Sequence, residues 1–450
     1  MADLTLANMY YSPVRDIPLG ALYVTAVLEK AGFEVDFKDY QATKHDNPYR
    51  IQLFKRFLEE SEDTLAIGCT SDLLPFVIHA LEEIKASEPE KKIILGGPGP
   101  SCAPEKLLES FPFIDVVVRG EAEQTMLQLM KAVKTSSYSG VKGIAYRKGS
   151  SVLSNPDRDR ITDLDSLPLP AYHQINPADY EEFHFVTSRG CMYPCTFCEV
   201  TPFWKSQIIE RNLKNVFMEL ELLSKDFGIG KITVSDDTFM LKRERVMEFC
   251  EKMNKLEMEW SCFGRVDLMD VGLMRAMEKA GCTSVYYGVE SGSDKVLEKI
   301  RKGFTIETAL DRLFESVAFF DSIASFIWGF PFESAHDLQK TLEAIDFVRE
   351  LGGHSQLHFL APSQLSQIYS EYKGSLEFSE LLQSDMGRGF LASGPDKPLI
   401  STLITSYPEV FAAFYYYPSP DFSEKLNIVR EFSEKHLQSV QEAEAANSQE

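Results

Sequence analysis

The sequence predicts an α/β protein with two successive sheet domains and a mainly helical C-terminal region. Short apolar, β-branched runs alternate with amphipathic helical runs twice along the chain, once before residue 138 and again after residue 183. This alternation is typical of parallel strands joined by crossover helices. Between the two series, residues 139–182 form an expected connector whose later part is rich in proline and acidic side chains.

The first series predicts a doubly wound, flavodoxin-like (Rossmann-type) domain over residues 1–138. Its expected strands are 3–9, 33–39, 64–70, 91–97 and 114–120. Its expected helices are 19–32, 47–60, 73–86, 103–111 and 121–133. Domains of this kind bind ligands at the carboxyl ends of their strands.

Three loops at that edge carry candidate ligand contacts. Thr70 and Ser71 follow the third strand, Gly97 and Gly99 follow the fourth, and Glu121 follows the fifth. Glycine lets the backbone approach a ligand closely because it has no Cβ. An ordinary βα turn explains any one of these loops, whereas three of them on one edge favour a ligand crevice.

The second series predicts a partial (β/α)6 barrel over residues 183–361. Its expected strands are 183–190, 230–237, 258–265, 283–290, 323–330 and 355–362. Six units are too few to close an eight-stranded barrel, and the reactive face should lie at the carboxyl ends of the strands. In the connector before it, residues 143–155 are expected to form a small hairpin.

The C-terminal region, residues 362–442, has a mixed, mainly helical pattern, and residues 443–450 are expected to be a disordered tail. Six aromatic residues are concentrated in a short part of this region: Tyr407, Phe411, Phe414, Tyr415, Tyr416 and Tyr417. One interpretation is an aromatic lid or wall over an apolar substrate. The simpler interpretation is that these aromatics pack onto the barrel.

The composition excludes several classes of protein. With 46 Lys and Arg against 68 Asp and Glu, the net charge is −22, which disfavours a nucleic-acid partner. The N-terminus lacks the layout of a signal peptide, and no apolar run reaches the length of about 18 residues expected of a transmembrane helix. Eight cysteines in 450 residues do not resemble a secreted disulfide framework. We therefore expect a cytoplasmic protein without a transmembrane segment.

Three of the cysteines, Cys191, Cys195 and Cys198, lie within eight residues in "SRGCMYPCTFCEV", directly after the first strand of the second series. A structural zinc site generally takes four ligands, and such a site or unrelated free thiols is the alternative interpretation. The C-x-x-x-C-x-x-C motif resembles that of the radical S-adenosylmethionine (SAM) superfamily. The resemblance implies a [4Fe–4S] cluster held by these cysteines, SAM bound at the fourth iron, and a flavodoxin-like or ferredoxin-like electron donor.

The same resemblance implies SAM contacts at the ends of the next three strands. Asp236 and Asp237 follow the second strand, where many members have Gly-Gly-Glu, and Arg265 and Glu290 end the third and fourth strands. An arginine and a carboxylate can each pair with one charged group of a zwitterion. A structural ion pair is the alternative for each of these residues.

A flavodoxin-like domain ahead of such a barrel resembles the cobalamin-binding subfamily, and the segments 18–40, 96–123 and 161–172 carry that resemblance. It implies cobalamin between the strand ends of the two domains, with contacts from Thr70, Ser71, Gly97, Gly99 and Glu121. The Asp-x-His-x-x-Gly motif whose histidine binds cobalt is absent. We therefore expect either cobalamin without a protein imidazole or a domain that has lost the cofactor.

Three functions follow from these resemblances. The first is methylation of an unactivated carbon in a small-molecule, lipid or peptide intermediate. The second is a radical cyclisation, rearrangement or carbon–carbon bond formation, with cobalamin in another role or absent. The third is a non-catalytic sensor with a vestigial barrel, which the intact cysteine motif argues against.

Overall fold

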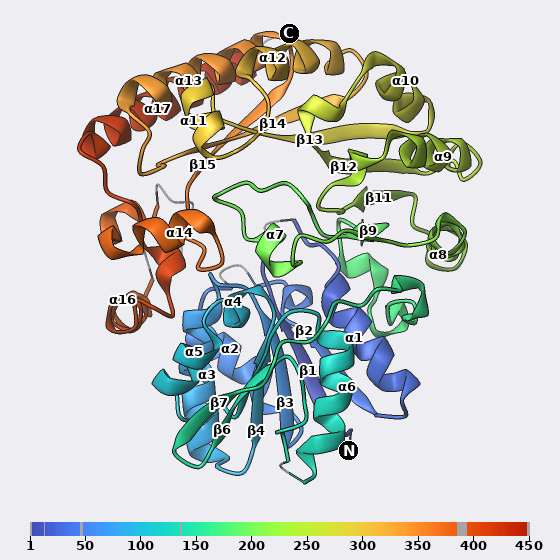
Figure 1. Ribbon diagram of the computed structural model, residues 1–450, viewed down its shortest axis with the longest axis vertical. Coiled ribbons are helices and arrows are strands. Elements are labelled where there is room, and N and C mark those ends of the chain that lie inside the picture. Colours follow the sequence, from blue (N-terminus) through green and yellow to red (C-terminus); the bar gives the residue numbers. More distant parts are fainter. Residues whose placement is uncertain (1, 13, 46–47, 136, 385–393, 448–450) are drawn as a thin grey trace.

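The computed structural model describes the chain except for residues 1, 13, 46–47, 136, 385–393 and 448–450. The first domain lies beneath an arched second sheet, and the C-terminal region lies beside both (Figure 1). The chain segment that carries the three clustered cysteines passes between the two sheets, next to the short helix α7 (Val200–Phe203). The predicted fold class, two α/β domains with parallel sheets, is confirmed.

The first sheet has the parallel strand order β2-β1-β3-β4-β5, which is the flavodoxin-like order. Its strands are β1 (Leu4–Met9), β2 (Val35–Asp39), β3 (Thr64–Cys69), β4 (Lys92–Gly96) and β5 (Val116–Val118). Its helices are α1 (Leu19–Lys30), α2 (Ile51–Glu59), α3 (Leu74–Ser87), α4 (Pro98–Ser101), α5 (Pro104–Ser110) and α6 (Ala122–Val133). Apolar side chains cover both faces of this sheet, which explains the nearly continuous apolar runs of its strands.

The predicted hairpin forms, but it belongs to the first sheet. Strand β6 (Ile144–Lys148) pairs antiparallel with β5, and β7 (Ser151–Ser154) pairs with β6. The first domain therefore extends past residue 138, where the sequence placed the beginning of a connector. The reason is that β5 would otherwise be an exposed edge, and the apolar residues of β6 are buried against it.

The second sheet is parallel in the order β8-β11-β12-β13-β14-β15, an open half barrel of six strands. Its strands are β8 (His184–Phe185), β11 (Lys231–Val234), β12 (Glu259–Gly264), β13 (Cys282–Glu290), β14 (Asp321–Trp328) and β15 (His354–Phe359). Its main helices are α8 (Leu213–Phe227), α9 (Arg243–Met253), α10 (Val271–Lys279), α11 (Asp294–Lys299), α12 (Ile306–Ser316) and α13 (Ala335–Glu350).

The first barrel strand is shorter than the predicted 183–190. After β8 the chain leaves the sheet, and β9 (Ser188–Arg189) pairs antiparallel with β10 (Ile209–Glu210) instead. The carboxylate of Asp236 holds this departing segment, as described below. The consequence is that the cysteines begin outside the sheet, at its carboxyl edge.

The C-terminal region contains α14 (Gln367–Tyr372), α16 (Lys397–Ser406) and α17 (Phe422–Asn447). Most of its aromatic residues are packed in hydrophobic cores, in agreement with the simpler interpretation. These cores belong to the first domain as well as to the barrel. Phe411, Phe414 and Tyr415 belong to the core of the first domain, where the Phe411 ring lies 6.2 Å from that of Phe111. Tyr417 packs with the barrel residues around α11.

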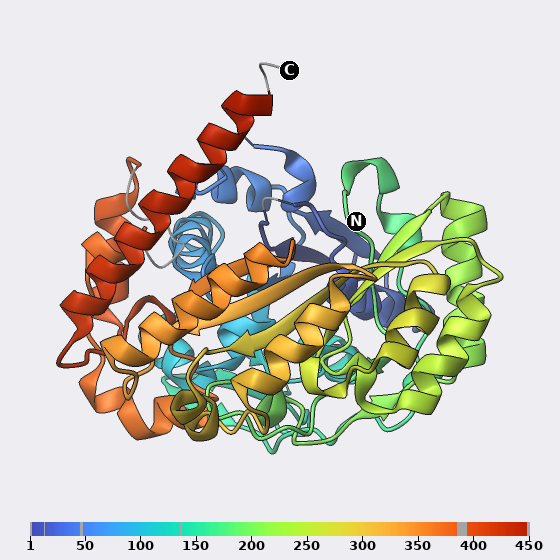
Figure 2. The same cartoon turned by 90° about the horizontal axis from the view of Figure 1, so that it is seen from above.

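The predicted disordered tail differs from the structure, in which α17 continues through Asn447 and crosses the molecule beside α13 (Figures 1 and 2). Alanine and glutamate dominate residues 441–446, and both favour helices without needing an apolar face. Residues 448–450 lie outside the described residues. No helix among the described residues is long and apolar enough to cross a membrane.

Candidate active site

The loop that follows β9 carries the three clustered cysteines at the carboxyl edge of the barrel. All three are partly exposed and none forms a disulfide. Thr238 Oγ1 donates a hydrogen bond to Cys191 Sγ at 3.1 Å, and Val200 N–H donates to Cys198 Sγ at 3.4 Å. Such donors stabilise a thiolate, which is the form that binds iron.

Burial raises the pKa of Cys195 and raises the pKa of Cys198 to about 11. A bound metal would therefore have to displace protons from these thiols. Among the residues that the structure describes, no three His, Cys, Asp or Glu side chains converge as a single ion requires. A cubane cluster spreads its thiolate ligands over separate irons, so three cysteines of one loop fit a cluster better than a single zinc ion.

Asp236 holds the backbone that leads into this loop. Its buried carboxylate accepts bonds from the N–H and the hydroxyl of Thr187, both at 2.6 Å, and from the hydroxyl of Ser188 at 2.7 Å. Burial raises the pKa of Asp236. Because these bonds engage both carboxylate oxygens, Asp236 positions the segment that leads into the cysteine loop, and its contact with SAM stays a prediction.

Asp237 anchors the next turn of the same segment, since it accepts a bond from Gly190 N–H at 2.8 Å. Gly190 has a φ of +109°, and a Cβ there would collide with the carbonyl oxygen of Gln207. Only glycine therefore allows the turn from β9 to Cys191.

Arg265, a predicted SAM contact, lies against the cysteine loop. Its guanidinium stacks 3.7 Å from the centroid of the Tyr193 ring, which lies between the first two clustered cysteines. The side chain donates two bonds of 3.0 Å to Asp267 and one of 2.6 Å to the carbonyl of Lys302. These bonds and the contact with Tyr193 hold the guanidinium beside the cysteine loop.

Glu290 ends β13 and accepts a bond of 2.7 Å from Lys302 Nζ, with both side chains nearly buried. Its φ of +77° is uncommon for a residue other than glycine and is typical of functional sites. Glu290, Lys302 and Arg265 all act electrostatically on Cys195, so the ends of the third and fourth barrel strands meet at the cysteine loop. A paired carboxylate and ammonium beside Arg265 provide partners for both charges of a zwitterion.

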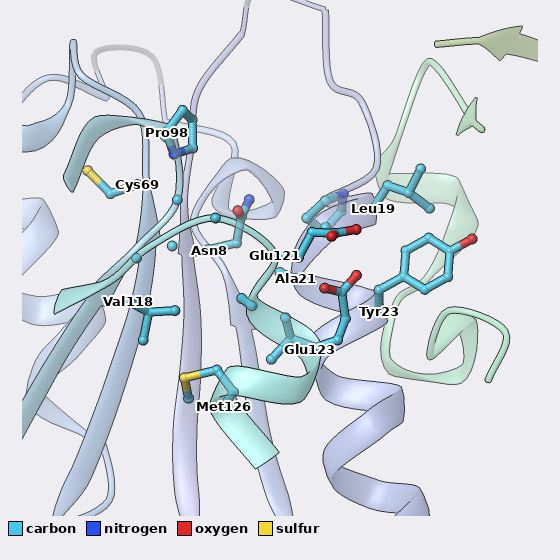
Figure 3. Close-up of a pocket in the computed structure, with 18 of the residues that line it drawn as sticks. Asn8, Leu19, Ala21, Tyr23, Cys69, Pro98, Val118, Glu121, Glu123 and Met126 are labelled. Atoms are coloured by element: carbon cyan, nitrogen blue, oxygen red, sulfur yellow. The ribbon is translucent and has the colours of Figure 1, made fainter. Parts of the chain in front are cut away.

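A cavity of about 430 Å³ opens at the carboxyl ends of β1, β3, β4 and β5. It continues between the sheet and helices α1 and α6, where the lining is mainly apolar, from Leu19 and Ala21 to Val118 and Met126 (Figure 3). The second domain closes it with Val186, Ser188, Arg189, Phe203, Trp204 and Asp237. Its position between sheet and helices suits a flat apolar group.

Some of the predicted cobalamin contacts line this cavity, and others do not. Thr70 and Gly97 line it, and Thr70 Oγ1 is buried without a hydrogen-bond partner in the described structure. Ser71 lines a different pocket. A Cβ on Gly97 would lie 2.8 Å from Cys69 N, and one on Gly99 would lie 2.7 Å from Thr70 C. These glycines therefore let the turn after β4 pack against the end of β3, and their contact with a ligand stays a prediction.

Glu121 is engaged in a buried network that joins the two domains. It accepts bonds from Arg160 Nε at 2.9 Å and from Arg189 Nη1 at 3.2 Å. Arg189 also pairs with Glu123 at 2.7 Å and stacks 4.9 Å from the Tyr23 ring centroid. Since Arg189 precedes the cysteine loop by two residues, this network fixes the loop against the first domain.

The chain matches two family models, the radical SAM superfamily over residues 185–345 and the B12 binding domain over residues 14–130. It is 30% identical over 341 residues to an uncharacterized methyltransferase of Pyrococcus horikoshii, and the alignment covers 72% of each chain. The chain belongs to the cobalamin-binding radical SAM family. Its cofactors are accordingly a [4Fe–4S] cluster, SAM and cobalamin.

Two further proteins show the range of that family. The chain is 27% identical over 384 residues to the anaerobic magnesium-protoporphyrin IX monomethyl ester cyclase of Cereibacter sphaeroides, covering 80% of this chain and 61% of the cyclase. The solved structure of the cobalamin-dependent SAM radical enzyme OxsB superposes with a TM-score of 0.68 at 18% identity, over 92% of this chain and 64% of OxsB. The similarity to OxsB shows that the two proteins share a fold.

For this member of the cobalamin-binding radical SAM family, sequence reasoning missed Lys302, Arg189 and Tyr193. Tyr193 lies inside the cysteine motif and Arg189 directly before its glycine, so proximity to the motif was the available signal. Lys302 gave no such signal, because its contact with Glu290 depends on how the loop after α11 folds back. No histidine is found among the described residues that line the cavity.

Proposed function

We propose that this radical SAM enzyme methylates an unactivated carbon of a small-molecule, lipid or peptide intermediate. One observation carries the proposal: Ser188 and Arg189 line the 430 Å³ cavity of the first domain and lead directly into Cys191. The two cofactor sites are therefore neighbours along a single short segment of chain. The name of the Pyrococcus relative, a methyltransferase, also supports this reaction.

When bound, the cluster and SAM supply a 5′-deoxyadenosyl radical that removes a hydrogen atom from the substrate, and cobalamin supplies the methyl group. The chain's own residues position these groups and keep water out. Cys191, Cys195 and Cys198 hold the cluster, and the donors Thr238 and Val200 stabilise two of the thiolates.

We assign Arg265, Glu290 and Lys302 to SAM. We propose that Glu290 accepts from the SAM amino group, while Arg265 and Lys302 bind its carboxylate. Support for this comes from the meeting of all three at Cys195. Asp237 lines the cavity of the first domain, so we assign it to the cobalamin side of the cysteine loop.

We propose that cobalamin binds in the 430 Å³ cavity, with a flat apolar part between the sheet and helices α1 and α6. Thr70 Oγ1, a buried hydroxyl with no partner in the described structure, supports a polar ligand atom at the mouth of the cavity. The described lining contains no imidazole, so we expect the lower face of cobalt to lack a histidine ligand.

The eight free cysteines support a reducing compartment, and we propose a cytoplasmic enzyme. We propose a flavodoxin-like or ferredoxin-like protein as its electron donor.

A cyclisation or rearrangement is the second candidate function, and the name of the Cereibacter relative, a cyclase, favours it. In such a reaction SAM would be cleaved without transfer of its methyl group. The two candidates therefore differ in the fate of that methyl group, which can be followed without knowing the substrate.

The experiment is to reduce the holoenzyme anaerobically with SAM that carries a labelled methyl group. Methylation predicts that label appears on the bound cobalamin, with one S-adenosylhomocysteine formed per label. Formation of 5′-deoxyadenosine while the cobalamin stays unlabelled would contradict the methylase and support the second candidate.

A further inference from the structure

A second pocket, of about 420 Å³, lies at the other end of the cysteine loop. It is lined by Cys198 and Glu199 of that loop, by Ser71 and Asp72 of the first domain, and by the ends of β14 and β15. The C-terminal region contributes residues 362–364 and Ala413. All three regions of the chain therefore meet at this pocket, next to a cysteine that we assign to the cluster.

The pocket is lined by two carboxylates and by one histidine, His358, whose Nε2 lies 3.2 Å from Gln356 Oε1 and 3.2 Å from the Tyr286 hydroxyl. Asp72 and Glu199 are its carboxylates, and no lysine or arginine is found among its described lining residues. Glu199 Oε2 accepts a bond of 2.5 Å from the hydroxyl of Ser363. No ion pair of Asp72 or Glu199 with a described basic side chain appears in the structure. Both carboxylates thus line the pocket without a lysine or arginine partner, and His358 is the one basic side chain among its described lining residues.

The other walls are apolar. Phe197 and Ile327 line the pocket together with Phe359, Leu360 and Pro362. A pocket of this size with a few polar groups on one side fits a small ligand that has an apolar body and one polar end.

We propose that the second pocket binds the substrate, and that this substrate presents a cationic amine to Asp72 and Glu199. The inference rests on the proposed function, because Cys198 marks the reacting face only if it holds the cluster. An ammonium group in this pocket gains two charge partners that compensate for its loss of water. A carboxylate or phosphate there would meet two like charges, with His358 as the one basic side chain of the described lining, so anionic substrates are disfavoured.

Cys102 provides a reporter of occupancy inside the pocket. Its thiol lines the pocket, 4.0 Å from Glu199 Oε2, and is partly exposed. The other cysteines outside the cluster motif, Cys69, Cys250, Cys262 and Cys282, are buried. In the holoenzyme, a ligand in the second pocket should therefore shield Cys102 from alkylation.

The test measures the alkylation rate of Cys102 by mass spectrometry in the anaerobic holoenzyme with SAM bound. Three matched probes are titrated: 2-phenylethylamine, 2-phenylethanol and 3-phenylpropionate. The amine should protect Cys102 at a concentration about tenfold lower than the alcohol, and the carboxylate should protect least. In Asp72→Asn the ratio of amine to alcohol should fall several-fold, whereas Asp226→Asn, an exposed carboxylate on α8, should leave it unchanged.

Three results would overturn the inference. These are protection by the carboxylate as strong as by the amine, an amine preference that survives both Asp72→Asn and Glu199→Gln, and no protection by any probe up to about 10 mM. The readout does not depend on methyl transfer. A failure here with a positive methyl-label experiment would therefore remove the substrate class and leave the proposed function standing.

Discussion

The two sheets of this protein follow the same βα pattern, yet their strand ends carry different chemistry. In the first domain the strand ends border a largely apolar cavity, and the nearby carboxylates of Glu121 and Glu123 are paired with Arg160 and Arg189. In the barrel, the strand ends bring Arg265 and Glu290 to the cysteine loop, and the loop after α11 adds Lys302. The first edge suits a large flat ring, and the second suits a charged, zwitterionic ligand.

The comparison teaches that a shared topology fixes where a ligand binds but not how it is bound. Hydrophobic burial should dominate at the first sheet, while ion pairs and thiolate ligation should dominate at the second. Because the two sites depend on different interactions, a substitution should be able to remove either site while the other remains. The following predictions are ordered from the largest expected effect to the smallest.

Cys195→Ala should abolish reductive SAM cleavage and lose the cluster, because one iron of the cubane would have no thiolate. Cobalt content should stay near one per chain, since Cys195 does not line the first cavity. Iron, sulfide and cobalt analysis with a 5′-deoxyadenosine assay checks both statements. Cys250→Ala, a buried thiol in α9, is the control and should keep its iron. Full SAM cleavage by Cys195→Ala would contradict the assignment of Cys195 as a ligand of the cluster.

Ala21→Trp should weaken cobalamin binding by about 10- to 100-fold, because the indole would fill the cavity from α1. The cluster should assemble normally in this variant. Equilibrium binding of cobalamin, followed by its visible absorption, measures the effect. The matched control is Ala31→Trp, an exposed position just after α1, which should bind as the wild type does. Equal loss of cobalamin and iron in Ala21→Trp would mean that the two sites are not separable.

Arg189→Met should lower the free energy of unfolding by about 3–5 kcal/mol, because it leaves the buried carboxylate of Glu123 without its cation and removes one of the two cations that pair with Glu121. Denaturant unfolding measures this loss. Arg312→Met removes a more exposed pair with Glu315 and should cost no more than about 1 kcal/mol. Comparable losses in the two variants would show that the buried network between the domains contributes no more to the free energy of unfolding than an exposed ion pair does.

Asp337 lines neither cavity, and its carboxyl group offers a test of how stability depends on pH. Burial opposes ionisation of this carboxyl, but hydrogen bonds from Ser334, Ser293 and Lys295 outweigh it and lower the pKa of Asp337. An unfolded aspartate titrates near pH 3.9, so the stabilisation is fully present above about pH 5 and is lost as the pH falls below about 4, toward the folded pKa. Asp337→Asn should therefore be less stable than the wild type at neutral pH, and this difference should shrink in acid. Thermal unfolding across that range checks the trend, and a constant difference would contradict it.

Local patterns were enough to predict the strands, the cysteine motif and the edge at which both sites lie. The alternation of apolar runs predicted all five parallel strands of the first sheet and the six of the barrel. These features depend on residues close together in the sequence, where periodicity and spacing are visible.

Partners that come from distant segments could not be predicted in this way. The sequence predicted Asp236 and Glu121 as ligand contacts but not their protein partners, Thr187 and Arg189, which come from the segment that crosses between the sheets. A buried carboxylate must be paired, and the sequence does not show with what. The same limit applies to Phe411, whose contact with the first domain spans most of the chain.

The central claim is that the cysteine loop lies directly beside the cobalamin cavity. The most direct test is electron paramagnetic resonance of the holoenzyme with both the reduced cluster and cob(II)alamin present. The structure predicts that the two spectra broaden or split through mutual magnetic interaction, and that cob(II)alamin shows no nitrogen splitting from a histidine. Two unperturbed spectra, equal to those of the cluster alone and of cob(II)alamin alone, would contradict the claim.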